Sequence, residues 1–263
     1  MTSVVVKLGG HALDSIEPRS PVLVDLAQDI GELRAQGTDV LVVHGGGPQI
    51  AALLASVGLE SRFHEGLRIT DSATMGYTSM ALAQVNLLIT AALNQAGLAS
   101  VGLSGADTTM LCALALGEPW DRAGDTPKVR DDIVTTLWAA GLTPVVSPVA
   151  VDERGELLNC NADTVAGALA GAFGAEVLVL LSDVDQLRAD PEDEATALTS
   201  VTGDQVREML ARNTAREGMR PKVIAALDAL GAGARCVLVA NGTRRHALRD
   251  ALARTIATTE VLA

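Results

Sequence analysis

The chain of 263 residues is long enough to bury a substantial core, and its 48% hydrophobic and 20% charged residues are ordinary for a globular protein. Its formal net charge of −12 argues against nucleic-acid binding, because nucleic acids select basic surfaces. The sequence does not open with a basic region and an apolar run, and no uninterrupted apolar stretch reaches the roughly 18 residues of a membrane span. We therefore expect a cytoplasmic protein that contacts neither nucleic acid nor membrane.

Hydrophobic periodicity predicts strands and helices in alternation. A strand at 4–7 precedes a helix at 20–37, in which Ser20 is the expected N-cap and Pro21 the first helical residue. Residues 38–44 form a nearly continuous apolar run, which is typical of a parallel strand covered on both faces. Further strands are predicted at 99–104, 143–151, 176–182 and 235–240. Further helices are predicted after HGGGP and at 72–97, 162–174, 203–212, 218–231 and 244–255.

This alternation predicts an α/β fold with three α-β-α layers around a mainly parallel sheet. We place a boundary near Gly174 and Ala175, so that residues 1–174 and 175–263 form two lobes. Ligands of open α/β sheets bind beyond the carboxyl ends of the strands. The functional site is therefore expected where the strands end.

Two glycine-rich turns, KLGG and HGGG, stand at such strand ends. Gly9 and Gly10 follow Lys7, and Gly45 and Gly46 follow the second strand and open a helix. Glycines allow backbone N–H groups to approach a ligand closely, and a helix N-terminus favours negative charge. The two turns together with the lysine predict a phosphate or carboxylate site. They match neither the P-loop nor the dinucleotide-binding signature.

Lysine is scarce in this sequence, with Lys7, Lys128 and Lys222 against 17 arginines. A lysine ammonium is a compact charge that approaches one oxygen, whereas arginine presents a planar fork. Lys7 and Lys222 are therefore candidates for a specific role, while Lys128 is assigned to a loop without function. Three widely spaced cysteines without a CxxC pair argue against a disulfide framework or a zinc site, and predict buried thiols in a reducing compartment.

Six segments, in this order and at these spacings, resemble the amino acid kinase family: VVVKLGGHAL, VVHGGGPQI, FHEGLRITD, LLNCNADTVAGALA, LLSDVDQL and REGMRPKVIAALDAL. The resemblance covers nearly the whole chain, and GLRIT with NCNAD resembles the members that phosphorylate N-acetyl-L-glutamate. It implies transfer of a phosphoryl group from ATP to the side-chain carboxylate of that substrate, in arginine biosynthesis. Magnesium would be held mainly by the nucleotide phosphates, with no dedicated protein ligands.

The resemblance implies catalytic roles for Lys7, Lys222 and Asp163. The two lysines would neutralise the phosphoryl group in transfer, and Asp163 would lie between them and fix their positions. The attacking carboxylate is already ionised at neutral pH, so that no general base is required. His44 is accordingly expected to be a structural hydrogen-bonding residue.

Binding roles are implied in the same way. Arg68 would clamp the α-carboxylate of the substrate in a bidentate pair, and Asn159 would hydrogen-bond it, with Asn161 less clearly involved. The amides of Gly45 and Gly46 would also face the substrate, while Gly10 would bind phosphate and Gly9 would serve the turn itself. The residues assigned to the nucleotide are Gly9, Gly10, Ser182, Asp183, Leu187 and Met219. Asp185 and Gln186 depart from the family pattern, which usually has a glycine near that point.

The arginine-inhibited members carry an N-terminal helical extension, whereas here Lys7 is six residues from the start. We therefore expect a homodimer that arginine does not regulate, with the helix at 72–97 either at the dimer surface or wholly in the core. The alternative functions are a kinase of lysine biosynthesis, which acts on aminoadipate or glutamate attached to an acidic carrier protein, and a non-catalytic amino-acid-binding regulator. A chain of net charge −12 would repel an acidic carrier, and the three catalytic residues argue against a regulator.

Overall fold

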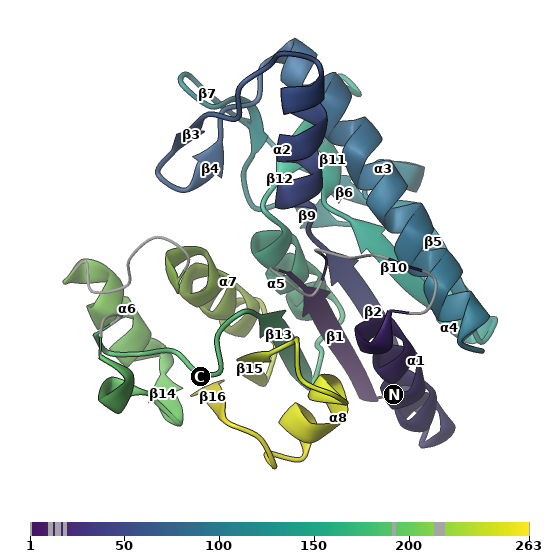
Figure 1. The fold of residues 1–263 in the computed structure, drawn as a ribbon, viewed down its shortest axis with the longest axis vertical. Coiled ribbons are helices and arrows are strands. Elements are labelled where there is room, and N and C mark those ends of the chain that lie inside the picture. The colour runs from purple at the N-terminus through teal and green to yellow at the C-terminus, as the bar shows by residue number, and fades with distance from the viewer. Residues whose placement is uncertain are drawn as a thin grey trace.

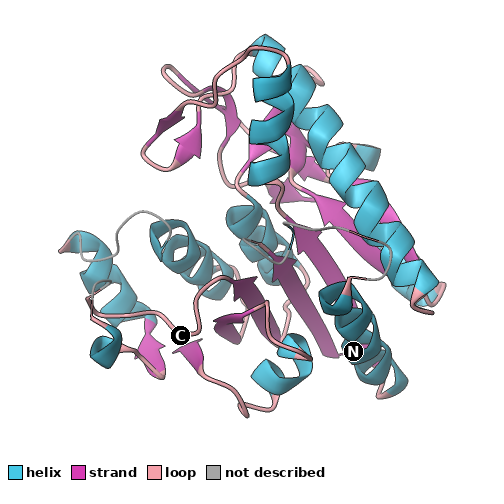
Figure 2. Ribbon diagram, in the orientation of Figure 1, coloured by secondary structure: helices cyan, strands magenta, loops and turns pink. Residues whose placement is uncertain are grey.

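The computed structural model describes residues 2–9, 13, 17, 20–190, 193–212 and 219–262. Its centre is an eight-stranded sheet with the order β14-β16-β15-β13-β1-β2-β10-β5 (Figures 1 and 2). All neighbouring pairs are parallel except β15 with β16. The strands are β1 Thr2–Leu8, β2 Thr38–His44, β5 Ser100–Ser104, β10 Thr143–Ser147, β13 Val177–Ser182, β14 Ser200–Thr202, β15 Cys236–Asn241 and β16 Thr258–Leu262.

Helices cover both faces of this sheet, which confirms the predicted three-layer architecture. Side chains alternate along β1, so that Val4, Val6 and Leu8 enter one hydrophobic cluster and Val5 enters the other. The first face is covered by α1 Pro21–Ala35, α3 Ser72–Gln95 and α8 Ala247–Leu252. The second face is covered by α4 Asp132–Ala139, α5 Ala162–Ala172, α6 Gly203–Ala211 and α7 Met219–Gly231. Both faces of the central strands are therefore buried.

A second, six-stranded sheet lies beyond the carboxyl ends of β2 and β10, at the top of Figure 1 together with α2 Gly47–Ser56 and a short hairpin. The strand order of this sheet is β7-β8-β12-β11-β6-β9. Its strands are β6 Leu111–Cys112, β7 Ala115–Gly117, β8 Asp121–Gly124, β9 Lys128–Val129, β11 Val149–Val151 and β12 Leu157–Cys160, and the hairpin is β3 Phe63–His64 with β4 Leu67–Arg68. These elements surround the edge of the main sheet at which β2 and β10 end.

Some predicted elements have different bounds in the structure. The strand expected at 143–151 is two strands, because Pro148 has no N–H for a sheet ladder and the chain passes there from the main sheet to the second one. The helix expected at 244–255 is reduced to α8, because His246 has a left-handed backbone (φ 49°) that cannot belong to a helix. Lys128 lies in strand β9 rather than in a loop.

Helix α3 bears on the expectation that no segment of this chain crosses a membrane. It contains no charged residue over 24 residues, and by length and composition it is apolar enough to cross a membrane. Its inner face, however, packs Val85, Ile89 and Leu93 into the core against the main sheet. This packing is that of a core helix, with Met80 and Leu87 left exposed on its outer side.

Candidate active site

The ion pair of Lys7 and Asp163 lies at the carboxyl end of β1. Alternation along the strand directs Lys7 to the same face as Val5, which is the face that α5 covers. Asp163 lies in the first turn of α5, and its Oδ1 is 2.8 Å from Lys7 Nζ. Both side chains are less than one-tenth exposed. The sequence-predicted catalytic lysine and aspartate are thus in direct contact.

Lys222 contributes to the same electrostatic centre. Burial of the Asp163 carboxyl opposes its ionisation, but the charges of Lys7 and Lys222 outweigh burial and hold its pKa below the usual value. Lys222 comes from α7, which packs closely on α5 because Gly167 has no side chain. A Cβ at Gly167 would lie only 2.8 Å from the carbonyl oxygen of Ala225 on α7. The structure therefore brings together all three residues that were predicted to be catalytic.

The glycine turns are arranged differently from the expectation. The amide of Gly9 donates to Leu181 O (3.1 Å) and the amide of Gly45 donates to Leu8 O (3.0 Å), so both join strand ends to one another. Gly10 lies outside the described residues. Gly46 and Gly47 occupy the N-cap and first position of α2, where N–H groups have no intrahelical acceptor. Among the glycines predicted to bind an anion, Gly46 therefore keeps this role as a prediction and Gly10 stays untested, while Gly47 is a further candidate.

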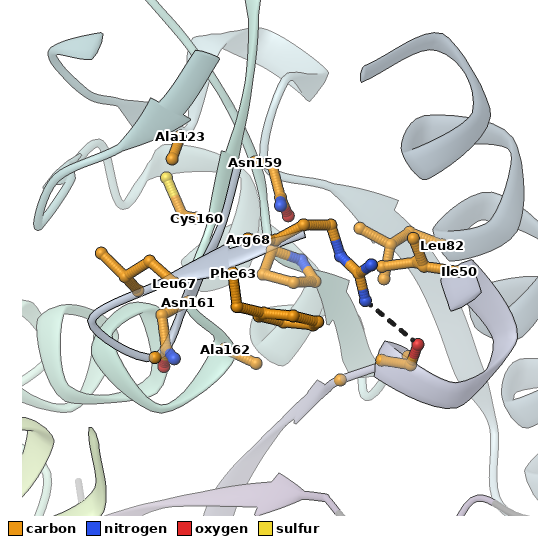
Figure 3. Close-up of a pocket in the computed structure, with 15 residues that line it drawn as sticks. Ile50, Phe63, Leu67, Arg68, Leu82, Ala123, Asn159, Cys160, Asn161 and Ala162 are labelled. Carbon is orange, nitrogen blue, oxygen red and sulfur yellow. Dashed lines mark hydrogen bonds between the residues drawn. The ribbon is translucent and has the colours of Figure 1, made fainter. Parts of the chain in front are cut away.

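A cavity of about 170 Å³ opens beside these amides, and Figure 3 shows the side chains that line it. Its walls come from α2, the β3–β4 hairpin, α3 and the second sheet. The apolar part of the wall contains Ile50, Phe63 and Leu82, none of which was predicted from the sequence. Arg68 and Asn159, which were predicted to bind the substrate, lie in the same cavity (Figure 3).

Arg68 is held in place by neutral groups. Its Nη1 donates to Ser61 Oγ and its Nη2 donates to Gly47 O (3.2 Å), and its guanidinium lies 4.7 Å from the centre of the Phe63 ring. The residue is 7% exposed, and no carboxylate of the described residues pairs with it. Burial lowers the pKa of the guanidinium, which still remains charged. Within the described residues, the positive charge of Arg68 is therefore balanced by no carboxylate.

Hydrogen bonds connect the GLRIT and NCNAD motifs. Asn159 Nδ2 donates to Thr70 Oγ1 (3.1 Å), and Thr70 in turn donates to Arg68 O (2.9 Å). Thr70 is fully buried, and sequence reasoning missed it although it stands inside GLRIT. Asn161 caps α5 by accepting from the amides of Asp163 and Thr164. The capping role of Asn161 orients the helix that carries the catalytic aspartate.

His44 is structural, as expected. It is fully buried, and its Nδ1 donates to Gly45 O (2.7 Å) while its Nε2 lies 3.1 Å from Asn86 Nδ2, which donates to it. Burial lowers the pKa of His44 to about 4. The imidazole is therefore neutral, and it ties the start of α2 to α3 rather than acting as an acid or a base.

The β3–β4 hairpin is anchored to the second sheet by Trp120. The indole Nε1 donates to His64 O (3.0 Å), and the two rings pack edge to face with their centres 5.0 Å apart. The amide of Thr70 donates to Trp120 O (3.2 Å), so the chain on both sides of the hairpin is attached to the same residue. The hairpin places Phe63 over the cavity (Figure 3).

The residues assigned to the nucleotide lie at the end of β13 and the start of α7. Ser182 is buried and accepts a hydrogen bond from the amide of Val184 (3.3 Å), whereas Asp183 is exposed. Leu187 is fully buried in the core, and its amide donates to Thr259 Oγ1 (2.8 Å). Met219 is partly buried against the same core. The buried Leu187 can thus stabilise the loop formed by residues 182–187, while Asp183 is accessible to a ligand.

The sequence profile of the amino acid kinase family matches residues 2–241, which is most of the chain. The chain belongs to the amino acid kinase family. Two relatives named acetylglutamate kinase agree with this placement. The protein from Deinococcus radiodurans is 44% identical over 94% of this chain and 96% of its own length. The protein from Symbiobacterium thermophilum is 39% identical over 94% of this chain and 86% of its own length.

A solved structure extends the comparison to three dimensions. The crystal structure of smu.665 from Streptococcus mutans UA159 superimposes with a TM-score of 0.81 at 26% identity, covering 91% of this chain and 94% of that one. The amino acid kinase fold predicted from the six motifs is therefore confirmed.

Proposed function

We propose that this amino acid kinase transfers the γ-phosphoryl group of ATP to the side-chain carboxylate of N-acetyl-L-glutamate, a step of arginine biosynthesis. The observation that carries this proposal is the buried, carboxylate-free Arg68 in a small cavity next to the N-terminus of α2. The names of the relatives, at 39% and 44% identity over nearly their full lengths, support the same substrate.

The cavity has two anion-binding ends and an apolar wall. We assign the α-carboxylate of the substrate to Arg68, whose remaining N–H groups suit a bidentate pair. The side-chain carboxylate is assigned to the amides of Gly46 and Gly47 at the start of α2, where the helix dipole favours a negative charge. Ile50, Phe63 and Leu82 provide apolar surface for the rest of the molecule.

The reaction needs charge neutralisation more than proton transfer. One oxygen of the side-chain carboxylate attacks the γ-phosphorus, and the bond from that phosphorus to the β–γ bridging oxygen breaks, giving an acyl phosphate and ADP. Lys7 and Lys222 would stabilise the negative charge on the transferring group, and Asp163 would hold the Lys7 ammonium at 2.8 Å. No proton changes place, which is compatible with the neutral, buried His44.

Magnesium is proposed to bind through the nucleotide. No group of three or more metal-ligating side chains occurs within the described ranges. Mg²⁺ keeps much of its hydration and commonly binds through substrate phosphates, so the residues present fit an ion carried in with ATP. When bound, it would supply further neutralisation of the phosphate charge.

We propose a division of labour between residues 1–174, which bind the amino-acid substrate, and residues 175–263, which bind ATP. The eight-stranded sheet continues across this boundary, because β1 pairs with β13. The lobes are therefore functional parts built on one shared sheet. Three unpaired cysteines fit the reducing cytoplasm, where we place the protein.

We further propose that two copies associate through the outer face of α3. Met80 and Leu87 are 63% and 69% exposed on a helix without charged residues, and they border a groove that also contains Leu103. An exposed apolar patch of this kind marks a contact surface. Sedimentation velocity of Leu87→Lys should show a monomer where the wild type is a dimer. A wild-type monomer at micromolar concentration would contradict the proposal.

The substrate assignment is tested by trapping the acyl phosphate with hydroxylamine in the presence of Mg-ATP. N-acetyl-L-glutamate, L-glutamate, L-aspartate and N-acetyl-aminoadipate should be compared at equal concentrations. We expect turnover with N-acetyl-L-glutamate and little with the others. Turnover that requires an added carrier protein would favour the kinase of lysine biosynthesis, and binding without turnover of any acceptor would favour a regulatory protein.

A further inference from the structure

We propose that Gly9 is a positioning residue whose missing side chain leaves the space in which the Lys7 ammonium lies. This inference rests on the proposed function only in requiring Lys7 to act on the phosphoryl group. It assigns to Gly9 a task different from forming the turn or binding phosphate with its amide.

Two other reasons for a glycine at this position do not apply. The φ of Gly9 lies outside the left-handed region, so a left-handed backbone is not the reason for a glycine here. Its amide donates to Leu181 O at 3.1 Å, so that the N–H is already occupied within the protein. Neither a left-handed backbone nor an amide left for a ligand therefore accounts for the glycine at this position.

The space next to Gly9 gives the reason. A Cβ built on Gly9 would lie 2.1 Å from Lys7 Nζ and 3.0 Å from Lys7 Cε, whereas the nearest backbone atom, Leu181 O, is at 3.6 Å. The Lys7 side chain therefore extends forward along the chain and lies over Gly9. In this conformation its ammonium is 2.8 Å from Asp163 Oδ1 and the residue is 7% exposed.

An alanine at this position would displace the lysine and leave the fold intact. The clashing atoms are the far end of a flexible side chain, so they can move without a shift of the backbone. To restore an ordinary van der Waals distance, the ammonium must move by about 1 Å or more. A misplacement of about 1 Å in a catalytic group can reduce the rate by about 100-fold.

The experiment compares Gly9→Ala with the wild type and with Gly31→Ala, whose Cβ would meet no atom within 4 Å on α1. We expect Gly9→Ala to lower kcat by about 10- to 100-fold, with KM for N-acetyl-L-glutamate within about twofold of wild type and an unchanged Tm. Gly31→Ala should keep the wild-type kcat. A Gly9→Ala enzyme with wild-type kcat would overturn the inference.

Two further measurements separate positioning from a general structural effect. In a Lys7→Met background, Gly9→Ala should cause no additional loss of kcat, because its effect passes through the lysine; an equal loss in both backgrounds would overturn the inference. In a crystal structure of Gly9→Ala, Lys7 Nζ should have left Asp163 Oδ1, and an unchanged distance of 2.8 Å would also overturn it. Absence of wild-type turnover would contradict the proposed function, while the crystal structure would still decide the role of Gly9.

Discussion

Asp163 Oδ1 and Lys7 Nζ, separated by 156 positions in the sequence, lie 2.8 Å apart with both side chains nearly buried. The contact joins the end of β1 to the first turn of α5, and the charge of Lys222 on α7 acts on the same carboxylate. Elements from both sides of the proposed lobe boundary thus meet at one aspartate. The consequences of this arrangement can be measured residue by residue.

Replacing Asp163 with asparagine should lower kcat by about 100-fold or more, because the lysines lose the anion that fixes their positions. The same change should lower the free energy of unfolding by about 3 kcal/mol, since it breaks a buried ion pair and leaves a cation uncompensated. Steady-state kinetics and urea unfolding measure the two effects. Asp204→Asn, which removes an exposed pair with Arg207, should cost less than about 1 kcal/mol. Equal losses of stability in the two variants would contradict the account.

Replacing Arg68 with methionine should raise KM for N-acetyl-L-glutamate by about 100-fold while KM for ATP stays near the wild-type value. The change removes charge-assisted hydrogen bonds worth about 1.5–3 kcal/mol each to the substrate carboxylate. Arg235→Met, at an exposed position next to β15, serves as the matched control and should leave both KM values unchanged. An Arg68→Met enzyme with an unchanged KM for the amino acid would place the α-carboxylate elsewhere.

His44 should make the protein less stable as the pH falls from about 6.5 to about 4. Its pKa in the folded state is about 4, against 6.5 in the unfolded chain, so the unfolded state binds more protons in this window and protonation favours unfolding. The slope from this residue approaches about 1.4 kcal/mol per pH unit. Asp163, whose pKa is lowered, loses its contribution only at more acidic pH. Urea unfolding of His44→Gln should show a shallower slope between pH 6 and 4.5, and identical slopes would refute a buried neutral histidine.

Trp120→Phe should raise KM for N-acetyl-L-glutamate by about 5- to 10-fold with little effect on Tm. The change deletes one hydrogen bond and weakens one ring contact that hold the β3–β4 hairpin over the cavity, together about 1–2 kcal/mol. Trp138→Phe is a matched control, because its indole donates to Val40 O (3.0 Å) and packs on Phe173 in the core. That variant should lose stability and keep its KM. The opposite pattern in the two variants would rule out a hairpin anchor at Trp120.

Much of the fold could be read from the sequence, because long buried strands and amphipathic helices have clear periods. The strand at 38–44 has the predicted bounds, and α6 begins after a capping box of Thr202 and Gln205. The second sheet could not be predicted, since strands of two to four residues, such as Leu111–Cys112, carry no measurable alternation. The break at Pro148 was equally hidden within an apolar run.

The site was predictable as a set of residues but not as a geometry. The family resemblance placed Lys7, Lys222 and Asp163 together, and no local pattern reports on contacts between residues so far apart in the chain. The task of Thr70, a buried hydroxyl between Asn159 and Arg68, depends on a pairing of two motifs that only the fold creates. The crowding of Lys7 against Gly9 likewise requires atomic positions.

The central claim is that one cavity orients N-acetyl-L-glutamate between Arg68 and the start of α2. A crystal structure with this substrate and a non-hydrolysable ATP analogue tests it most directly. We predict the α-carboxylate on the Arg68 guanidinium, the side-chain carboxylate at the Gly46 and Gly47 amides, and the γ-phosphate between Lys7 and Lys222. A substrate bound in the reverse orientation, or outside this cavity, would contradict the account.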